Sequence, residues 1–387
     1  MDRCGRRFGC STSTAPDDAT LAVLRQAVDA VEGAICGADC PAAGCGPGWG
    51  DRIDPSQVQG PVGLVPPAVD PATAPSLSDV AAFCRAHPKY DTPPPLLALP
   101  DATALPEWCG EDEAYRQMIA SCGETHIVVV SADADAAVAD GTVVRPFATI
   151  GDALRACGSG SCHILVGTGT YVESLQVPPC TFIDGGIRVA NGIATRGAAR
   201  PHIEGHVNAR AGTIVLARID VRDGYGALST DGDVLVSEAV LRGGYEGGSS
   251  AFMATGPRLC RTHVAAGYSG FDIAWHSSRL WMAGSAVSAC YEGMGLSWGS
   301  RGLKVVDSVV YAGYSAVGTS WGSVDVEVRG TRLGSDYAAV DIHIAPDEYQ
   351  VFPATFDVSV TNNRIASGSL PESNPALNIV VSNNVRE

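Results

Sequence analysis

The chain has 387 residues, and its 42 acidic residues outnumber its 26 lysines and arginines, which gives a formal net charge of −16. This balance argues against a nucleic-acid partner, because neutralising phosphates needs a basic surface. Apolar residues make up 45% of the sequence, enough for a buried core, but no apolar run reaches the roughly 18 to 20 residues of a membrane span. We therefore expect a monomer with no transmembrane segment and no nucleic-acid partner.

Cysteine is unevenly distributed along the chain. Eight of the thirteen cysteines lie in the first 122 residues, so we predict a Cys-rich, Pro-interrupted helical module over residues 1–125, held by disulfides, before a second domain over residues 126–387. Zinc binding by Cys36, Cys40 and Cys45 is the alternative, but no histidine stands nearby. Disulfides need an oxidising compartment, so we expect a secreted, periplasmic or cell-surface protein. The pairing cannot be deduced, and an odd number leaves one thiol over.

The N-terminal module contains three predicted helices. Apolar residues at three- and four-residue spacing predict a helix over Asp17–Ile35. Ser76 or Ser78 is placed to cap a second helix that reaches Cys84 or His87, and Glu111–Ala120 is the third. The first ten residues lack the apolar core of a secretory signal, so we expect that signal to have been removed, and Cys4 leaves a lipid anchor as an alternative.

An internal repeat of 23 residues dominates the second domain. Each unit holds two or three short β-branched runs, with too few residues between them for crossover helices. A period in the low twenties predicts a mainly β fold, a parallel β-helix with about 22–23 residues per coil and coils about 4.8 Å apart. The leucine-rich repeat has a similar length, but its leucine signature is missing. Two aromatic series keep the register, with Tyr225 as an earlier, shorter-spaced copy: Tyr245, Tyr268, Tyr291, Tyr314, Tyr337 and Phe252, Trp275, Trp298, Trp321.

Two segments upstream of the repeat carry a resemblance. Asp140–Leu154 (DGTVVRPFATIGDAL) and Ile164–Glu173 (ILVGTGTYVE) resemble the opening segment of right-handed parallel β-helix proteins of the pectate-lyase-like superfamily. The resemblance covers about residues 140–387 and implies a short capping helix over Thr149–Cys157 before the first coil. It implies little about activity, because the superfamily includes lyases, hydrolases, epimerases, adhesins and other surface proteins.

The C-terminal coils carry paired asparagines. Asn362 and Asn363 follow one short strand, and Asn383 and Asn384 follow another. We expect these amides to stack as a ladder at a turn of the solenoid.

Side-chain alternation predicts which face of the repeat is buried. In the strand after each tyrosine, the third, fifth and seventh residues share one face, and the third and fifth are mostly apolar, as are Phe271 and Ile273. We therefore expect the tryptophan series to stack inside the coil at a corner. An exposed tryptophan ribbon that stacks on sugar rings is the alternative.

The opposite face of the same strand is built almost wholly from small residues. A solvated strand face normally carries larger polar residues, so we expect this face to be covered, with the N-terminal module favoured over a chain-like ligand. Its members are Gly247, Ser249, Ala251, Gly270, Asp272, Ala274, Gly293, Gly295, Ser297, Ala316, Gly318, Ser320, Ala339, Asp341 and His343, of which Asp272, Ser297, Ser320, Asp341 and His343 are the candidate ligand contacts.

One cluster of residue types fits polysaccharide lyase or epimerase chemistry, which needs a base, an acid and a group that neutralises a uronate carboxylate. Its candidate catalytic residues are Tyr268, Asp272 and His276, with His263 and Arg261 on the preceding unit. The segment faintly resembles the Tyr-Gly-Phe-Asp-Pro-His motif of mannuronan C5-epimerases, but its tyrosine is displaced by one residue and its histidine by two. The ladder supplies a structural reason for Tyr268.

Carboxylate groups in the repeat are candidates for hydrolysis and for metal binding. Asp272 and Asp341 stand three coils apart, about 14 Å, and Glu246 and Glu292 two coils apart, about 10 Å, so neither pair predicts a hydrolase site. Glu246 and Glu292 each follow a ladder tyrosine, and we expect both on a solvated turn. No cofactor is required by the sequence, and calcium is the one candidate. Solvated acidic loops are the alternative for its possible ligands, which are Asp220, Asp223, Asp231 and Asp233.

These observations favour an exported surface or periplasmic β-helix scaffold that binds a glycan or another cell-envelope component along one long face. The alternative is a carbohydrate-active enzyme, a lyase, epimerase or hydrolase, acting on an acidic polysaccharide. A third possibility is a spacer or adhesin without a glycan. Lys304 is the only lysine after Lys89, which removes a common lyase base.

Overall fold

The computed structural model describes residues 68–101, 104–123, 125–158, 161–190, 192–197, 199–209, 212–250, 253–320, 322–342 and 357–387. Its helices are α2 (Leu77–Ala86), η2 (Glu107–Cys109), α3 (Glu111–Cys122), α4 (Ile150–Cys157) and the late η3 (Pro375–Leu377). The Ser76 side chain caps α2 by accepting a hydrogen bond from the Asp79 amide. The second and third predicted helices are thus confirmed, whereas Asp17–Ile35 and Cys4, Cys10, Cys36, Cys40 and Cys45 lie outside the described residues.

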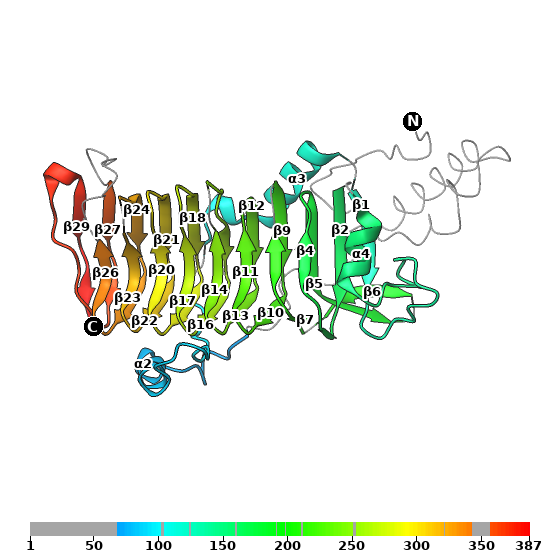
Figure 1. The fold of residues 1–387 in the computed structure, drawn as a ribbon, viewed down its shortest axis with the longest axis horizontal. Coiled ribbons are helices and arrows are strands. Elements are labelled where there is room, and N and C mark those ends of the chain that lie inside the picture. Colours follow the sequence, from blue (N-terminus) through cyan, green and yellow to red (C-terminus); the bar gives the residue numbers. More distant parts are fainter. Residues whose placement is uncertain are drawn as a thin grey trace, which may run out of the picture. The chain divides into compact units, whose positions relative to one another are not determined.

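Three sheets form a parallel β-helix of about nine turns (Figure 1). Within the described part of the chain, the strands pair in parallel, except β6 with β5, which pair antiparallel. Sheet A holds β1 (Thr125–Val130), β2 (Ser161–Gly167), β5 (Thr181–Ala190), β6 (Ile193–Arg196), β9 (Thr213–Ala217), β12 (Asp233–Ser237), β15 (Arg258–Cys260), β18 (Ser278–Ala283), β21 (Arg301–Val306), β24 (Val324–Arg329), β27 (Val358–Thr361) and β29 (Ile379–Ser382).

Sheets B and C complete each turn. Sheet B holds β3 (Thr170–Tyr171), β7 (His202–Glu204), β10 (Asp220–Asp223), β13 (Val240–Gly243), β16 (His263–Ala266), β19 (Ala286–Ala289), β22 (Val309–Ala312), β25 (Arg332–Ser335), β28 (Arg364–Ile365) and β30 (Val385–Arg386). Sheet C holds β4 (Leu175–Val177), β8 (Val207–Ala209), β11 (Gly226–Thr230), β14 (Glu246–Ser250), β17 (Ser269–Ile273), β20 (Glu292–Leu296), β23 (Ser315–Thr319) and β26 (Ala338–Ile342).

The strand register follows the sequence period. Ser269 pairs with Glu292, and Glu292 pairs with Ser315, so equivalent residues of successive turns are 23 residues apart in this part of the chain. The predicted fold class and period are confirmed.

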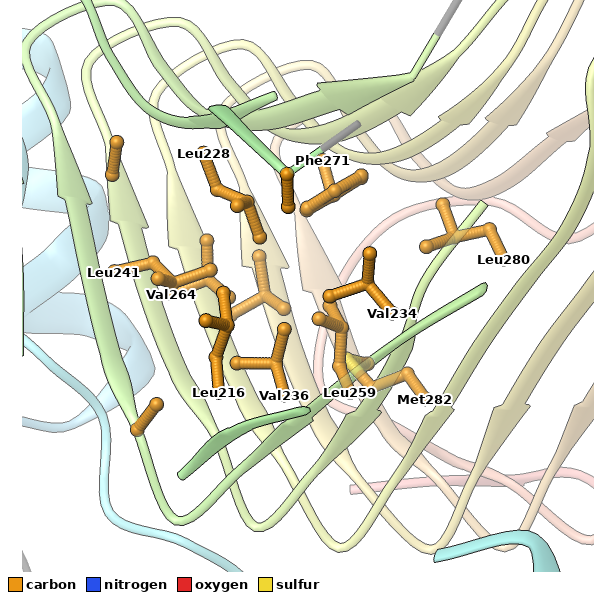
Figure 2. Packing of buried hydrophobic residues seen from close by; sticks show 14 of the residues in the cluster. Leu216, Leu228, Val234, Val236, Leu241, Leu259, Val264, Phe271, Leu280 and Met282 are labelled. Atoms are coloured by element: carbon orange, nitrogen blue, oxygen red, sulfur yellow. The ribbon is translucent and has the colours of Figure 1, made fainter. Parts of the chain in front are cut away.

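The core is a column of apolar side chains inside the coils. Figure 2 shows Val236, Leu259 and Met282 among the side chains that meet in the interior, and these three are successive register partners in sheet A. All three are fully buried, as is Phe271 from sheet C. Burying one such side chain contributes about 1.5–3 kcal/mol to the free energy of unfolding. Each coil buries equivalent side chains against the preceding coil, so this stabilisation recurs along the solenoid.

A polar ladder lines the corner between sheets A and B. Each coil turns there through one residue with positive φ, such as Asp307 or Asn362. From Thr262 to Asn384 the next residue carries a polar side chain, whereas the two coils before Thr262 carry Ile219 and Ala239 at this position. The side chain of Asn384 accepts a hydrogen bond from the Asn363 amide at 2.9 Å, which confirms the predicted asparagine ladder. The same contact continues backwards through the residues Thr331, Ser308, Ser285 and Thr262.

Helix α4 closes the N-terminal end of the core. Thr149 caps the helix, and the Glu173 carboxylate accepts hydrogen bonds of 2.8 Å from the Ile150 and Gly151 amides. Glu173 ends the second of the two segments that carried the resemblance, so its carboxylate joins them. The capping helix implied by the resemblance is confirmed.

Residues 77–101 and 104–122, which we call the strap, lie on the outer faces of sheets A and B. Helix α2 packs Leu77 and Val80 against Tyr311 of sheet B, and α3 packs Ala114 and Met118 against sheet A. Disulfides hold the strap at three points, and a fourth bond joins α4 to β2: Cys84–Cys290, Cys109–Cys260, Cys122–Cys180 and Cys157–Cys162. The four disulfides indicate an oxidising, extracytoplasmic location.

A buried ion cluster ties α3 to the coils. The Arg218 side chain is only 2% exposed, and its guanidinium contacts Asp184 at 2.7 Å and Glu111 of α3 at 2.8 Å. Arg196 also contacts Asp184, at 2.6 Å, so the Arg218–Glu111 contact is the member of the cluster that joins the strap to the coils. Removing Arg218 would leave the Glu111 carboxylate without its guanidinium.

The strap changes the expected disulfide pattern of the N-terminal region. Among the described cysteines, Cys84, Cys109 and Cys122 pair with the coils and not within residues 1–125. Residues 68–123 belong to the same compact unit as the coils. The boundary near residue 125 stays a prediction, since residues 1–67 lie outside the described part. No helix in the described part is long and apolar enough to cross a membrane.

Candidate ligand-binding face

A ladder of six tyrosines follows the corner between sheets B and C. Successive ring centroids are 4.6–5.3 Å apart and the rings are nearly parallel, from Tyr225 through Tyr245, Tyr268, Tyr291 and Tyr314 to Tyr337. The end members are 65% and 59% exposed, so the ladder lies on the outside of the solenoid. Tyr90 of the strap contacts the middle of the ladder edge-on, at Tyr268 and Tyr291.

The tryptophans lie outside the coil, at the corner between sheets C and A, and the prediction that they stack inside is wrong. The rings of Trp275 and Trp298 are stacked with centroids 4.6 Å apart, and Trp275 is 43% exposed. Strands β17 and β20 end two residues earlier, and both tryptophans have positive φ, which ends the strand alternation. Phe252 and Trp321 lie outside the described residues.

The small-residue face divides into two sets. A Cβ on Gly270 or Gly293 would point into the core, 2.5 Å from a methyl carbon of Val287 and 2.6 Å from one of Val310, respectively. These glycines are therefore required by interior packing, and counting them as outward was wrong. The alternation of side chains is interrupted at Gly270. Ser269 pairs with Glu292 and Phe271 pairs with Met294 of the next coil, but Gly270 between them has no partner in the strand register.

Two outward rows remain on sheet C. The side chains of the first row lie between two rows of inward apolar side chains, as strand alternation requires. The second row consists of the first residue of each strand from β11 to β26. The first row reads Gln176, Asn208, Ser229, Ser249, Asp272, Gly295, Gly318, Asp341. The second reads Gly226, Glu246, Ser269, Glu292, Ser315, Ala338. Acidic and small residues make up most of this face, and neither row holds a lysine or an arginine.

Glu292 and Asp272 meet over the glycines of the first row. A Cβ on Gly295 would lie 2.8 Å from Asp272 Oδ1 and 3.1 Å from Glu292 Oε1, so these two oxygens are at most about 6 Å apart. The Glu292 carboxylate also covers Gly318. The expectation of a solvated turn for Glu292 is wrong, because the missing side chains of two successive glycines let it fold forward onto the sheet.

The environment raises the pKa values of both carboxyl groups. Burial, followed by the charges of Asp272 and Asp341, raises the pKa of Glu292 to about 8. Burial, followed by the charge of Glu246, raises the pKa of Asp272 to about 6, against the effect of a hydrogen bond from the Ile273 backbone. Both carboxyl groups therefore hold a proton more readily than ordinary acids do, and the shift is larger for Glu292.

The tyrosine ladder is electrostatically linked to these acids. Burial and then neighbouring tyrosines and Glu292 raise the pKa of Tyr268 to about 12. Desolvation, and then Asp341, raise the pKa of Tyr314. The phenols thus stay protonated beside the acidic rows and retain their hydrogen-bond donors.

The other predicted catalytic residues do not gather around Asp272. His263 lies on sheet B beneath the strap, where its Nδ1 donates to the Leu97 carbonyl at 2.9 Å and burial lowers its pKa to about 4. Arg261 lies at the corner between sheets A and B, 3.8 Å from Glu238. His276 follows Trp275 at the far corner of sheet C and is exposed.

The four aspartates considered for calcium are divided between two sheets. Asp220 of sheet B contacts His202 at 3.2 Å, and Asp223 accepts hydrogen bonds from the Tyr225 and Gly226 amides. Asp233 of sheet A contacts Arg279 at 2.7 Å, and Asp231 precedes it. Among the described residues, no three Asp, Glu, His or Cys side chains are placed to hold a metal ion.

The remaining ligand-face candidates lie at the ends of the same strands. Ser297 and Ser320 are half-buried just beyond β20 and β23, and their amides bond to the preceding coils. Asp341 ends the first outward row, and His343 lies outside the described residues. The described part of the strap packs on sheets A and B. Its Tyr90 contacts the tyrosine ladder, which borders sheet C. The N-terminal module thus does not cover the face through residues 68–123.

Comparison with known proteins gives no match: no family model, no curated protein and no solved structure matches this chain. The pectate-lyase-like resemblance therefore rests on the two segments alone, and the parallel three-sheet solenoid rests on the structure.

Proposed function

We propose that this protein is an extracytoplasmic β-helix scaffold that binds a glycan chain along the outer face of sheet C. The observation that carries the proposal is the pair of aromatic borders on that sheet. Stacked tyrosines precede its strands and stacked tryptophans follow them. Exposed aromatic rings stack on the apolar faces of sugars while hydroxyl and carboxylate groups bind the sugar hydroxyls.

Repetition also supports a chain as the ligand. The tyrosine rings recur every 4.6–5.3 Å over six coils, so a long ligand meets the same surface at each step. Solenoids commonly use such extended faces for binding. By contrast, the two outer faces under the strap hold buried apolar contacts.

Binding to a panel of neutral, acidic and basic polysaccharides, followed by tryptophan fluorescence and calorimetry, tests this proposal. Tyr314→Ala and Trp298→Ala should each weaken binding about tenfold, since one stacked ring contributes roughly 1 kcal/mol or more. Trp281→Ala is the matched control, because this tryptophan lies under the strap on sheet A, 5.4 Å from Trp108. Equal losses in all three variants, or no binding to any polysaccharide, would refute the proposal.

A carbohydrate-active enzyme is the second candidate, and the Glu292–Asp272 pair favours it. Two neighbouring carboxyl groups with raised and unequal pKa values are the arrangement that glycoside hydrolysis uses. Asp272→Asn and Glu292→Gln should then abolish release of reducing ends from a cleaved polysaccharide, while Glu327→Gln on sheet A should not. Intact polysaccharide after long incubation with the wild-type protein would remove this candidate.

A further inference from the structure

The outer face of sheet C is short of positive charge. Glu246, Asp272, Glu292 and Asp341 stand in its two outward rows, and the described rows contain no lysine or arginine. Burial raises the pKa of Glu246, against the effects of a hydrogen bond with Ser249 and of the neighbouring His206, which precedes β8. A ligand on this face therefore meets an acidic floor between two aromatic borders.

The two central carboxyl groups differ from acids elsewhere in the coils that are paired with arginines. Asp184 is paired with Arg218 at 2.7 Å and with Arg196 at 2.6 Å, and Asp233 is paired with Arg279. The described residues supply no such cation to Glu292 or Asp272, whose charged neighbours are acidic. Burying acids without a cation is costly, so an external cation would be stabilised there.

A second observation at the same place concerns Ser269. This residue stands between Glu246 and Glu292 in the second outward row and is only 4% exposed. Its Oγ is buried and has no hydrogen-bond partner. Buried hydroxyl groups are normally paired, so this one lacks the donor or acceptor that a ligand would bring. An ammonium group would donate to this hydroxyl and to the adjacent carboxylates.

We infer that the ligand of sheet C is an amine-bearing glycan, in which protonated amino groups bind the Asp272–Glu292 pair and the sugar rings stack on the aromatic borders. This inference rests on the proposed glycan-binding function and names its substrate class. Ammonium groups also interact favourably with tyrosine and tryptophan faces, so both features of the face act on the same ligand. A uronate chain would bring like charges together, which gives the face its selectivity.

The test compares oligomers of equal length at neutral pH and low ionic strength by calorimetry. The probes are glucosamine oligomers, N-acetylglucosamine oligomers, galacturonate oligomers and oligolysine. The glucosamine oligomer should bind at least about tenfold more tightly than its acetylated counterpart, because one desolvated charge pair contributes about 1.5 kcal/mol or more. In the Asp272→Asn/Glu292→Gln variant this preference should fall to about twofold or less.

Glu327→Gln is the matched control, because Glu327 lies on sheet A and contacts Lys304 at 3.4 Å. It should leave the preference unchanged. If acetylated or galacturonate oligomers bind as tightly as glucosamine oligomers, the inference is overturned while the proposed function stands. If oligolysine binds more tightly than the glucosamine oligomer, the ligand is a cationic peptide and the inference is overturned. If no glycan binds, both the inference and the proposed function are overturned.

Discussion

The outer faces of sheets A and B differ from the outer face of sheet C, although one 23-residue repeat builds all three. On sheets A and B the outward residues include Val215, Leu235 and Ala265, which are buried under the strap. On sheet C the corresponding positions hold acidic and small residues. Packing inside each coil constrains only the residues whose side chains point inward. The residues that point outward therefore differ according to what each face contacts.

Removing Arg218, the buried cation under the strap, should have the largest effect on the covered faces. Arg218→Ala should lower the free energy of unfolding by about 3–5 kcal/mol, because it leaves the Glu111 carboxylate without its guanidinium and leaves Asp184 with Arg196 alone. Urea titration followed by circular dichroism measures this loss. Arg222→Ala, at an exposed position of the same coil, should change stability by less than about 0.5 kcal/mol. Similar values for both variants would mean that the cluster does not hold the strap.

Removing one covalent attachment should have the next largest effect. Cys109→Ser/Cys260→Ser opens a bond between residues 151 apart, and we expect a loss of about 2–4 kcal/mol with faster proteolysis within the strap. The control, Cys157→Ser/Cys162→Ser, opens a bond between residues 5 apart and should cost less. Limited proteolysis with mass spectrometry locates the cuts, and cuts confined to sheet C would contradict the covering role of the strap.

The outer face of sheet C should give the protein a stability that falls with rising pH. The pKa of Glu292 is about 8 in the folded protein and about 4.5 in an ordinary environment, so folding retains a proton between these values. The free energy of unfolding should therefore fall as pH rises through this window, by up to about 1.4 kcal/mol per pH unit. Thermal denaturation across this range measures the slope.

Glu292→Gln should flatten this slope, because glutamine does not titrate, and it should raise stability at the alkaline end of the window. Glu327→Gln on sheet A should keep the wild-type slope. If the Glu292→Gln variant kept the wild-type dependence of stability on pH, the carboxyl group of Glu292 in the wild-type protein would ionise like that of an ordinary glutamate.

The exposed tryptophans give the smallest expected effect. Trp275→Ala should cost about 1 kcal/mol, the contribution of one ring stack, because the side chain lies outside the core. Acrylamide should quench the fluorescence of Trp275 and Trp298 efficiently in the wild-type protein. A cost of about 3–5 kcal/mol, as for a buried aromatic residue, would return these side chains to the interior.

The repeat made much of the fold predictable from sequence. The 23-residue spacing of tyrosines such as Tyr268 and Tyr291 predicts the coils, and Ser76 predicts where one helix begins, while the helix that Thr149 caps was implied by the resemblance. These features depend on neighbours in the chain or on a repeated register. The paired asparagines also predicted their own ladder, because equivalent positions of successive coils must meet.

The candidate site was harder to predict. The positive φ of Trp275 is set by the corner and not by the residue type, so alternation assigned its ring to the wrong side. The contact of Glu292 with Asp272 depends on how a flexible side chain folds over Gly295 and Gly318. Two glycines in register on an outward row were the sequence signal for it, because they leave space above the sheet. Disulfide partners, as for Cys109, depend on the path of the strap.

The three disulfides of the strap are nested, and nesting sets an order for oxidation during synthesis. Cys122–Cys180 lies within the span of Cys109–Cys260, which lies within the span of Cys84–Cys290. Because each partner emerges later than the last, the innermost bond can close first, and each closure shortens the loop that the next must close. The strap can therefore attach to the growing solenoid one disulfide at a time, beginning at the N-terminal coils, so that successive coils are covered as they form.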